Sequence, residues 1–360
     1  ANAQAVLGKV LAENPELKKN IKAVLREVEK IVEEINQLSV EKQKEKIQKL
    51  GIVVEKKVEE KYELPELSNA IPKKVITAFP PEPSKYPHIG HAKAALLNFL
   101  YAQKYKGKFI LRFEDSNPEL AKKEYYDAII EGLKWLGIKW NKIDYLSDHL
   151  PKYYKVIENF LVNGFAYVCL CEQEIVKEKR KQGEACVHRP QDAKTNLRLW
   201  KKMLKSYSEG RATVRLKIDM THPNTTLRDP SIARIVTASH PRMKKKFRIW
   251  PVYDFGTAML DVWEKITHRV RSKEFEIRKD LQQHIHKLVG ARSPITIEIG
   301  RFEIRGSPTK GRVIRELIKQ KAIIGWDDPR LTTLIALKRR GFVPEAINEF
   351  LISTGVTKAE

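Results

Sequence analysis

Two histidines flank a glycine in the segment Pro-His-Ile-Gly-His, residues 87–91, where an apolar helical pattern begins. The free N–H groups and the positive dipole end of a helix start attract anions. Imidazoles at His88 and His91 add hydrogen bonds as phosphate charge develops, and Gly90 lets a ligand approach the backbone. This arrangement indicates phosphoryl or adenylyl transfer, the alternative being two structural histidines. Zinc is disfavoured because zinc-binding helices place their histidines four apart.

A carboxylate follows the next predicted strand. Glu114 stands at the end of the run KFILRFE, residues 108–114. The carboxyl end of a parallel strand borders the crevice in which such sheets bind ligands, so an acid there is well placed to pair with an ammonium group. The alternative is a surface salt bridge.

The three cysteines of the chain lie close together in the sequence. They form a Cys-x-Cys and a Cys-x-His pair separated by a Lys/Glu-rich helix, with the residues Cys169, Cys171, Cys186 and His188. Three thiolates and an imidazole make a closed tetrahedral zinc site, which would stabilise a segment with little apolar core. The alternative is three reduced, partly buried thiols, and no disulfide framework is expected.

The elements that must position these residues alternate between strand and helix. A β-branched strand at 75–79 precedes a helix from about 90 to 105, a strand at 108–113 and an amphipathic helix at 120–137. Such alternation predicts an α/β fold with a parallel sheet, crossover helices and ligands at the carboxyl ends of the strands. The pattern breaks at 169–245 and returns afterwards.

We therefore expect a Rossmann-type core with additions at both ends. Residues 5–50 have apolar residues at helical spacing, and 53–74 are charged, carry two prolines and lack periodicity. The predicted segments are an N-terminal helical extension (1–52), a linker (53–74), a first Rossmann half (75–168), a zinc-containing insertion (169–245), a second half (246–305) and a C-terminal helical region (306–360).

The charge of the chain points to a polyanionic partner. Lys and Arg number 68 against 45 Asp and Glu, which gives a formal net charge of +23. Long phosphate backbones are the commonest partner for such an excess, so nucleic acid is expected, the alternative being a Lys-rich surface. No apolar run reaches the ~18 residues of a membrane span and the N-terminus is no secretory signal, so we expect no membrane partner and a cytoplasmic location.

Several segments together carry a resemblance to a known family. They are FPPEPSKYPHIGH (79–91), GKFILRFEDSNP (107–118), YDF (253–255), RSKEF (271–275) and GWDDPRL (325–331). The chain resembles glutamyl-tRNA synthetases of the archaeal and eukaryotic type, including their appended N-terminal helices in AVLGKVLAENPELKK (5–19). The resemblance implies a class I synthetase that activates glutamate with ATP and Mg²⁺ and transfers it to tRNA(Glu).

The resemblance also implies roles for single residues. His88, Gly90 and His91 match the ATP-binding signature, and Glu114 matches the acid that binds the α-amino group. Tyr253 matches a tyrosine of the amino-acid pocket.

Arg271 matches the arginine that reads the γ-carboxylate of glutamate. It favours glutamate over glutamine, because a guanidinium grips a carboxylate with two hydrogen bonds that an amide cannot match. The alternative is a phosphate contact or a surface arginine.

Other positions depart from the family pattern. Ala78 stands where the family has a substrate-contacting arginine, Lys85 replaces a glycine and Pro87 an apolar residue. Lys85 is the candidate substitute for the missing cation. In the mobile-loop signature only the segment SPTKG, 307–311, remains, so Lys310 is assigned to the developing pyrophosphate charge, with Arg312 as a second candidate.

The family also implies partners. The insertion packs against the tRNA acceptor stem, the region 306–360 contacts the stem, and the N-terminal helices could recruit further proteins. Relatives continue into two barrels that read the anticodon, so we expect either a separate C-terminal anticodon-binding subunit or a truncated chain.

Two further interpretations remain open. One is a non-catalytic descendant that binds tRNA or acts as a scaffold, which Ala78, Lys85 and the eroded mobile-loop signature favour. The intact His-Ile-Gly-His motif and the matching residues of the amino-acid pocket count against it. The other is a paralogue that glutamylates a modified tRNA base, against which the N-terminal helices and the long segment after 331 count.

Overall fold

The structure of the chain is a computed structural model that describes residues 2–50, 63–302, 304 and 306–358. The chain divides into two compact units, one over 1–61 and one over 62–360. The predicted linker, 53–74, therefore lies partly outside the described residues.

The N-terminal unit is helical, as predicted. It contains α1 (Ala3–Glu13), the 3-10 helix η1 (Pro15–Asn20), α2 (Ile21–Asn36) and α3 (Val40–Lys49). The apolar stripe of α2 buries Val28 and Val32, whereas Ile21 and Ile31 are exposed. The unit therefore has a small core and exposed apolar side chains.

The second unit is built on parallel strands. A three-stranded sheet has the order β1 (Ile76–Phe79), β2 (Lys108–Phe113) and β3 (Lys142–Tyr145), with all pairs parallel. The crossover helices are α4 (Ile89–Lys104) and α5 (Lys123–Trp135). The mixed α/β class with a parallel core is thus confirmed.

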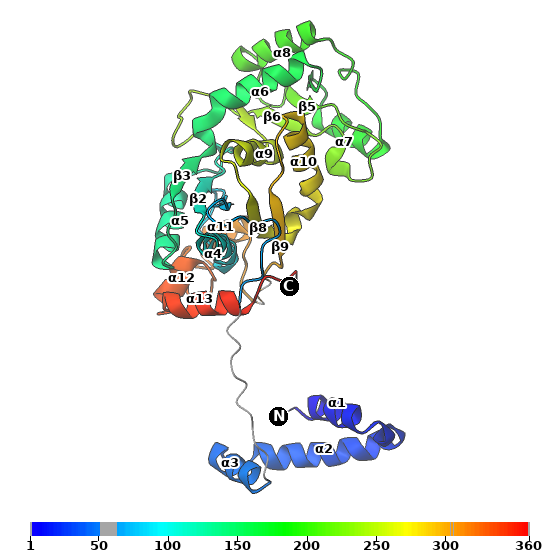
Figure 1. Ribbon diagram of the computed structural model, residues 1–360, viewed down its shortest axis with the longest axis vertical. Helices are drawn as coiled ribbons and strands as arrows, with labels where there is room; N and C mark the ends of the chain where they lie inside the picture. Colours follow the sequence, from blue (N-terminus) through cyan, green and yellow to red (C-terminus); the bar gives the residue numbers. More distant parts are fainter. Residues whose placement is uncertain (1, 51–62, 303, 305, 359–360) are drawn as a thin grey trace. The chain divides into compact units, whose positions relative to one another are not determined.

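A second parallel pair lies beside the first sheet. It joins β8 (His268–Ser272) to β9 (Ile295–Ile299), with the 3-10 helix η4 (Lys273–Arg278) and α10 (Lys279–Leu288) between them in the chain. The Thr267 N–H donates to the carbonyl of Ile76 (3.0 Å), which joins the start of β8 to β1. Figure 1 shows β2 and β3 on one side of α4 and β8 and β9 on the other.

A buried side chain of α4 replaces strand pairing along part of this seam. Asn98 Oδ1 accepts from the Val270 N–H (3.0 Å), and its Nδ2 donates to the Val270 carbonyl (2.9 Å) and to the carbonyl of Ala94 (2.8 Å). The backbone groups of Val270 that face β1 are therefore satisfied by a helix.

An antiparallel sheet separates the two parallel parts in the sequence. Its order is β4 (Ala166–Cys169), β5 (Thr213–Leu216), β6 (Ser231–Ile235) and β7 (Ile249–Pro251). The helices of this region are η2 (Leu146–His149), α6 (Leu150–Val162), α7 (Gln173–Gln182), α8 (Ala193–Lys205) and η3 (Thr225–Leu227). The sheet thus uses residues on both sides of the segment 169–245.

The remaining helices surround the parallel core. They are α9 (Tyr253–Trp263), α11 (Gly311–Lys319), α12 (Leu334–Arg339) and α13 (Pro344–Ser353). The Ile89 N–H donates to the Thr332 carbonyl (3.0 Å) and the Leu334 N–H to the Pro87 carbonyl (2.8 Å), which fixes the start of α4. None of the described helices is long and apolar enough to cross a membrane.

Candidate active site

A pocket of about 740 Å³ lies where four strands end. Residues at or just after the ends of β1, β2, β8 and β9 line it, among them Pro80, Glu114, Ser272 and Gly300. This is the edge of the sheet at which the sequence predicts a ligand. The predicted site residues on its wall are His88, Gly90, His91, Glu114, Tyr253, Arg271 and Lys310.

The two histidines are linked through the N-terminus of α4. His88 is the N-cap, and its Nδ1 accepts from the Gly90 N–H (3.1 Å), while the His88 N–H donates to Nδ1 of His91 (3.1 Å). The ring centroids are 3.9 Å apart. Because each Nδ1 is an acceptor, each neutral ring carries its proton on Nε2.

Both rings are neutral at neutral pH. Burial lowers the pKa of His88 to about 3, with smaller contributions from the charges of Lys85 and Arg301. Burial also lowers the pKa of His91 well below its ordinary value, helped by His88 and Lys85. The pair therefore offers two Nε2–H donors and no positive charge.

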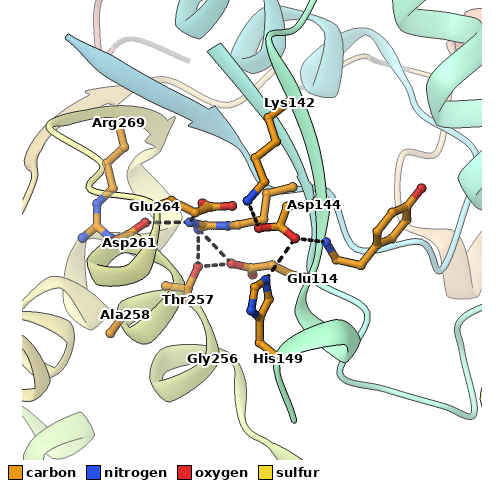
Figure 2. Close-up of polar contacts among 12 residues, drawn as sticks. Glu114, Lys142, Asp144, His149, Gly256, Thr257, Ala258, Asp261, Glu264 and Arg269 are labelled. Atoms are coloured by element: carbon orange, nitrogen blue, oxygen red, sulfur yellow. Dashed lines mark hydrogen bonds and ion pairs between the residues drawn. The ribbon is translucent and has the colours of Figure 1, made fainter. Parts of the chain in front are cut away.

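Glu114 belongs to a buried polar network (Figure 2). Nη2 of Arg112 donates to Glu114 Oε1 (3.2 Å) and to Thr257 Oγ1 (3.0 Å), and the Thr257 hydroxyl donates to the same Oε1. Burial raises the pKa of Glu114, and Arg112 is the strongest of the groups that lower it. The ion pair therefore opposes the cost of burying the carboxylate.

The other end of the Arg112 guanidinium is held by the helix α9. Its Nη1 donates to Asp261 Oδ1 and Glu264 Oε2, both at 2.9 Å, and Arg269 Nη1 contacts Asp261 Oδ2 at 2.5 Å. Burial raises the pKa of Glu264 to about 7, and Asp144 acts in the same direction. Figure 2 shows Asp261, Glu264 and Asp144 gathered near Glu114.

A polar stripe on α9 explains how this helix reaches the site. Tyr253, Thr257 and Asp261 are each four residues apart, which places them on one face, and Glu264 is the C-cap. Sequence reasoning found only Tyr253. The spacing of polar residues in an otherwise apolar helix was the available signal for the others.

Arg271 is held by a neutral amide. Its Nη1 donates to Gln282 Oε1 (3.1 Å), and Gln282 Nε2 donates to Asp254 Oδ1 (2.9 Å). Arg271 is buried and forms no ion pair with any residue that the structure describes. The ring of Tyr253 lies 5.4 Å from that of Phe275, which also lines the pocket.

The departures from the family pattern fall in different places. Ala78 is buried against Ile110 and Ile266. Lys85 lines the pocket and packs against Gly311, at the start of α11, and burial lowers its pKa. Lys310, the N-cap of α11, lines the pocket, whereas Arg312 is not among the described residues that do.

Sequence reasoning also missed Arg315. Its Nη1 donates to the Ser84 carbonyl (2.8 Å), which ties α11 to the loop before His88.

The predicted zinc ligands come together in the antiparallel part. The ligand atoms of Cys169, Cys171, Cys186 and His188 all lie within 4.8 Å of one another. The Cys169 and Cys186 sulfurs are 3.7 Å apart, and the Cys171 sulfur is 3.3 Å from Nδ1 of His188. Tetrahedral zinc with bonds of about 2.3 Å needs sulfurs about 3.8 Å apart, so this donor set fits zinc.

Comparisons with known proteins agree on one family. The family described as "tRNA synthetases class I (E and Q), catalytic domain" matches residues 74–360. The chain is 44% identical to a glutamate–tRNA ligase of Pyrococcus furiosus, over 100% of this chain and 64% of that protein. It is 43% identical to one of Nitrosopumilus maritimus, over 98% of this chain and 63% of that protein.

A solved structure shares the fold. It is a glutamate tRNA ligase from Elizabethkingia meningosepticum in complex with its amino acid, with a TM-score of 0.51 and 19% sequence identity. The match covers 68% of this chain and 53% of that one. The chain thus spans about 64% of the length of the first of the curated relatives.

Proposed function

Because this chain belongs to the catalytic-domain family of the class I tRNA synthetases for glutamate and glutamine, we propose that it activates glutamate with ATP. It then transfers the glutamyl group to the 3′ end of tRNA(Glu). The observation that carries the proposal is the single pocket that unites His88, His91, Glu114 and Arg271. It offers donors for phosphate, an acid for an ammonium group and a buried guanidinium for a second carboxylate.

In the proposed first step, a carboxylate oxygen of glutamate attacks the α-phosphorus of ATP in line, and pyrophosphate leaves with the electron pair of the broken P–O bond. In the second step, a ribose hydroxyl of the terminal adenosine attacks the carbonyl carbon and AMP leaves. Neither step needs a side-chain nucleophile. Catalysis is then positioning and stabilisation of charge.

The start of α4 binds ATP in this proposal. The Nε2–H groups of His88 and His91 donate to phosphate oxygens. The backbone N–H groups of Ile89, Gly90 and His91 are not free as the sequence predicted, because each already has an acceptor, and Gly90 instead leaves room for the His88 ring, which a Cβ would approach to 3.0 Å. Lys310 neutralises the leaving pyrophosphate. Lys85 adds positive charge at the same end of the pocket, where it helps to lower the pKa of both histidines. Mg²⁺ would enter with the nucleotide, since it binds in such sites through substrate phosphates, water and one or two carboxylates.

The other end of the pocket binds glutamate. In the described residues every side-chain hydrogen bond to Glu114 ends on Oε1, so Oε2 is the oxygen left for the substrate ammonium. Arg271 receives the γ-carboxylate, and Tyr253 forms a wall. Ala78 lies against apolar side chains and supplies no cation at the position where the family has a substrate-contacting arginine. In other proteins, removing one partner of a buried charge pair costs roughly 2–5 kcal/mol of binding free energy.

Zinc would be held by Cys169, Cys171, Cys186 and His188. Its contribution is structural, because four protein ligands leave no open position for chemistry. It joins the end of β4 to the segment after α7, two parts of the chain separated by a helix with no buried residue.

The partner of the basic surface is tRNA in this proposal. One face of α8 and its C-cap is strongly basic and carries Lys194, Leu197, Arg198, Lys201, Lys202, Lys205 and Ser206. We assign it, with the insertion, to the acceptor stem, and the region 306–360 to a further stem contact. Further partners of the N-terminal helices and a cytoplasmic location belong to the same proposal.

Glutamate-dependent exchange of pyrophosphate into ATP, measured with tRNA(Glu), tests the function. The assay is run with and without a separately supplied C-terminal part of a relative, because this chain covers only 64% of such a protein. Exchange in either condition, lost in Glu114→Gln and Arg271→Gln, supports the proposal. Absence of exchange in both conditions contradicts it.

A second candidate is a non-catalytic tRNA-binding module, which the apolar environment of Ala78 favours. It predicts tRNA binding without exchange, and Ala78→Arg then restores no activity.

A further inference from the structure

The two amino groups of Arg112 serve different parts of the molecule. Nη2 contacts Glu114, which lines the pocket, and Thr257, whereas Nη1 contacts Asp261 and Glu264 at the C-terminal end of α9. The Arg112 side chain is 1% exposed. A guanidinium is planar and rigid, so fixing Nη1 fixes the direction of Nη2.

This geometry constrains Glu114 through one oxygen. Arg112 and the Thr257 hydroxyl both donate to Oε1, and they also bond to each other (3.0 Å). Three groups joined in a closed ring leave the carboxylate little rotational freedom. Oε2 is therefore the oxygen presented to a ligand, in a direction set by Arg112.

We propose that Arg112 is a positioning residue that aims Glu114 at the amino-acid substrate and ties it to the helix that carries Tyr253. The inference rests on the proposed function, in which Glu114 binds the substrate ammonium. Tyr253, Thr257 and Asp261 share one face of α9, and Arg112 donates hydrogen bonds to the last two. Arg112 therefore fixes the position of β2 relative to the helix that carries Tyr253.

Arg112 has an electrostatic role as well. The groups that act on Glu114 include Arg112 from β2, Tyr253, Thr257 and Asp261 from α9, and Arg271 from β8. Burial raises the pKa of Glu114 and Arg112 opposes the rise most strongly. Removing Arg112 therefore raises the pKa of Glu114. The loss of glutamate affinity on acidification then begins at a higher pH.

The test compares Arg112→Met with Arg215→Met by calorimetric titration with glutamate from about pH 5.5 to 8.5. Arg215 is equally buried, lies in the antiparallel sheet and donates to the Asp229 carbonyl (2.8 Å). Both variants are expected to unfold at lower temperature. Only Arg112→Met should weaken glutamate binding about 10- to 100-fold, with the loss shrinking as the pH rises.

Two further variants keep the test decisive. Thr257→Val removes one donor of the ring and is expected to move the pH dependence in the same direction by a smaller amount, should Arg112→Met fail to fold. Glu264 also contacts Arg112 and has its pKa raised to about 7, so Glu264→Gln identifies its contribution. If the decrease in glutamate affinity at low pH disappears in Glu264→Gln, Glu264 and not Glu114 is the titrating group, and the assignment to Glu114 is overturned.

Crystal structures separate this inference from the proposed function. If the unaltered chain binds no glutamate, the proposed function fails, and the orientation of Glu114 in Arg112→Met still decides the role of Arg112. A rotated Glu114 carboxylate supports the inference. An unmoved Glu114, or a loss of affinity equal at all pH values, overturns it.

Discussion

Replacing Asn98 with alanine is expected to lower the free energy of unfolding by about 2 to 6 kcal/mol. The side chain is fully buried and satisfies both backbone groups of Val270 at the seam between β1 and β8. Alanine orphans one N–H and one C=O, and each unsatisfied buried group costs about 1–3 kcal/mol. The hydrogen bond to Ala94 adds little, because that carbonyl lies within the helix α4.

Urea unfolding of the full chain, followed by tryptophan fluorescence, measures this loss. Asn163→Ala is the matched control, since its Nδ2 also donates to the carbonyl four residues earlier (2.9 Å) but the residue is exposed. The control is expected to lose less than about 0.5 kcal/mol. Equal losses in the two variants would refute the role given to Asn98 in completing the sheet.

Three other predictions concern the metal cluster, the histidine pair and the basic surface. The purified chain should contain zinc at the Cys/His cluster, and Cys186→Ser should lose the metal and unfold at lower temperature, as measured by elemental analysis and calorimetry; a metal-free chain of unchanged stability contradicts this. Because burial lowers the pKa of His88 to about 3, unfolding takes up a proton between that pH and about 6.5. The free energy of unfolding should therefore fall on acidification across this window, and less steeply in His88→Asn. Identical slopes of the free energy of unfolding against pH in the two proteins contradict the assignment. Replacing Lys194, Arg198 and Lys201 with alanine should reduce the slope of log affinity for tRNA against log salt by about 0.9 for each duplex phosphate that is no longer neutralised, and an unchanged slope places the tRNA elsewhere.

Local signals predicted the elements that carry the histidines and the acid. The expected helix from about 90 to 105 is α4, Ile89–Lys104, and the expected strand 108–113 is β2. Apolar periodicity fixes such elements because each buries one face in the same core. The strands β4 and β6 were not predicted, since their pairing with β5 depends on contacts far apart in the sequence.

The residues that hold the site residues in place were harder to predict than the residues that line the pocket. Arg112, two residues before Glu114, looks like any strand residue in the sequence, and its partners on α9 lie about 150 residues away. Asn98 likewise looks like a polar residue of a helix, although it satisfies the backbone of β8. A buried charge network is defined by tertiary contacts, and single-sequence patterns do not contain them.

The most direct test of the account is a crystal structure of the chain with a non-hydrolysable glutamyl-adenylate analogue. We expect the ammonium group at Oε2 of Glu114, the γ-carboxylate at Arg271, and the phosphate at the Nε2 atoms of His88 and His91. An analogue bound elsewhere, or in the pocket with its amino acid directed away from Glu114 and Arg271, would contradict it.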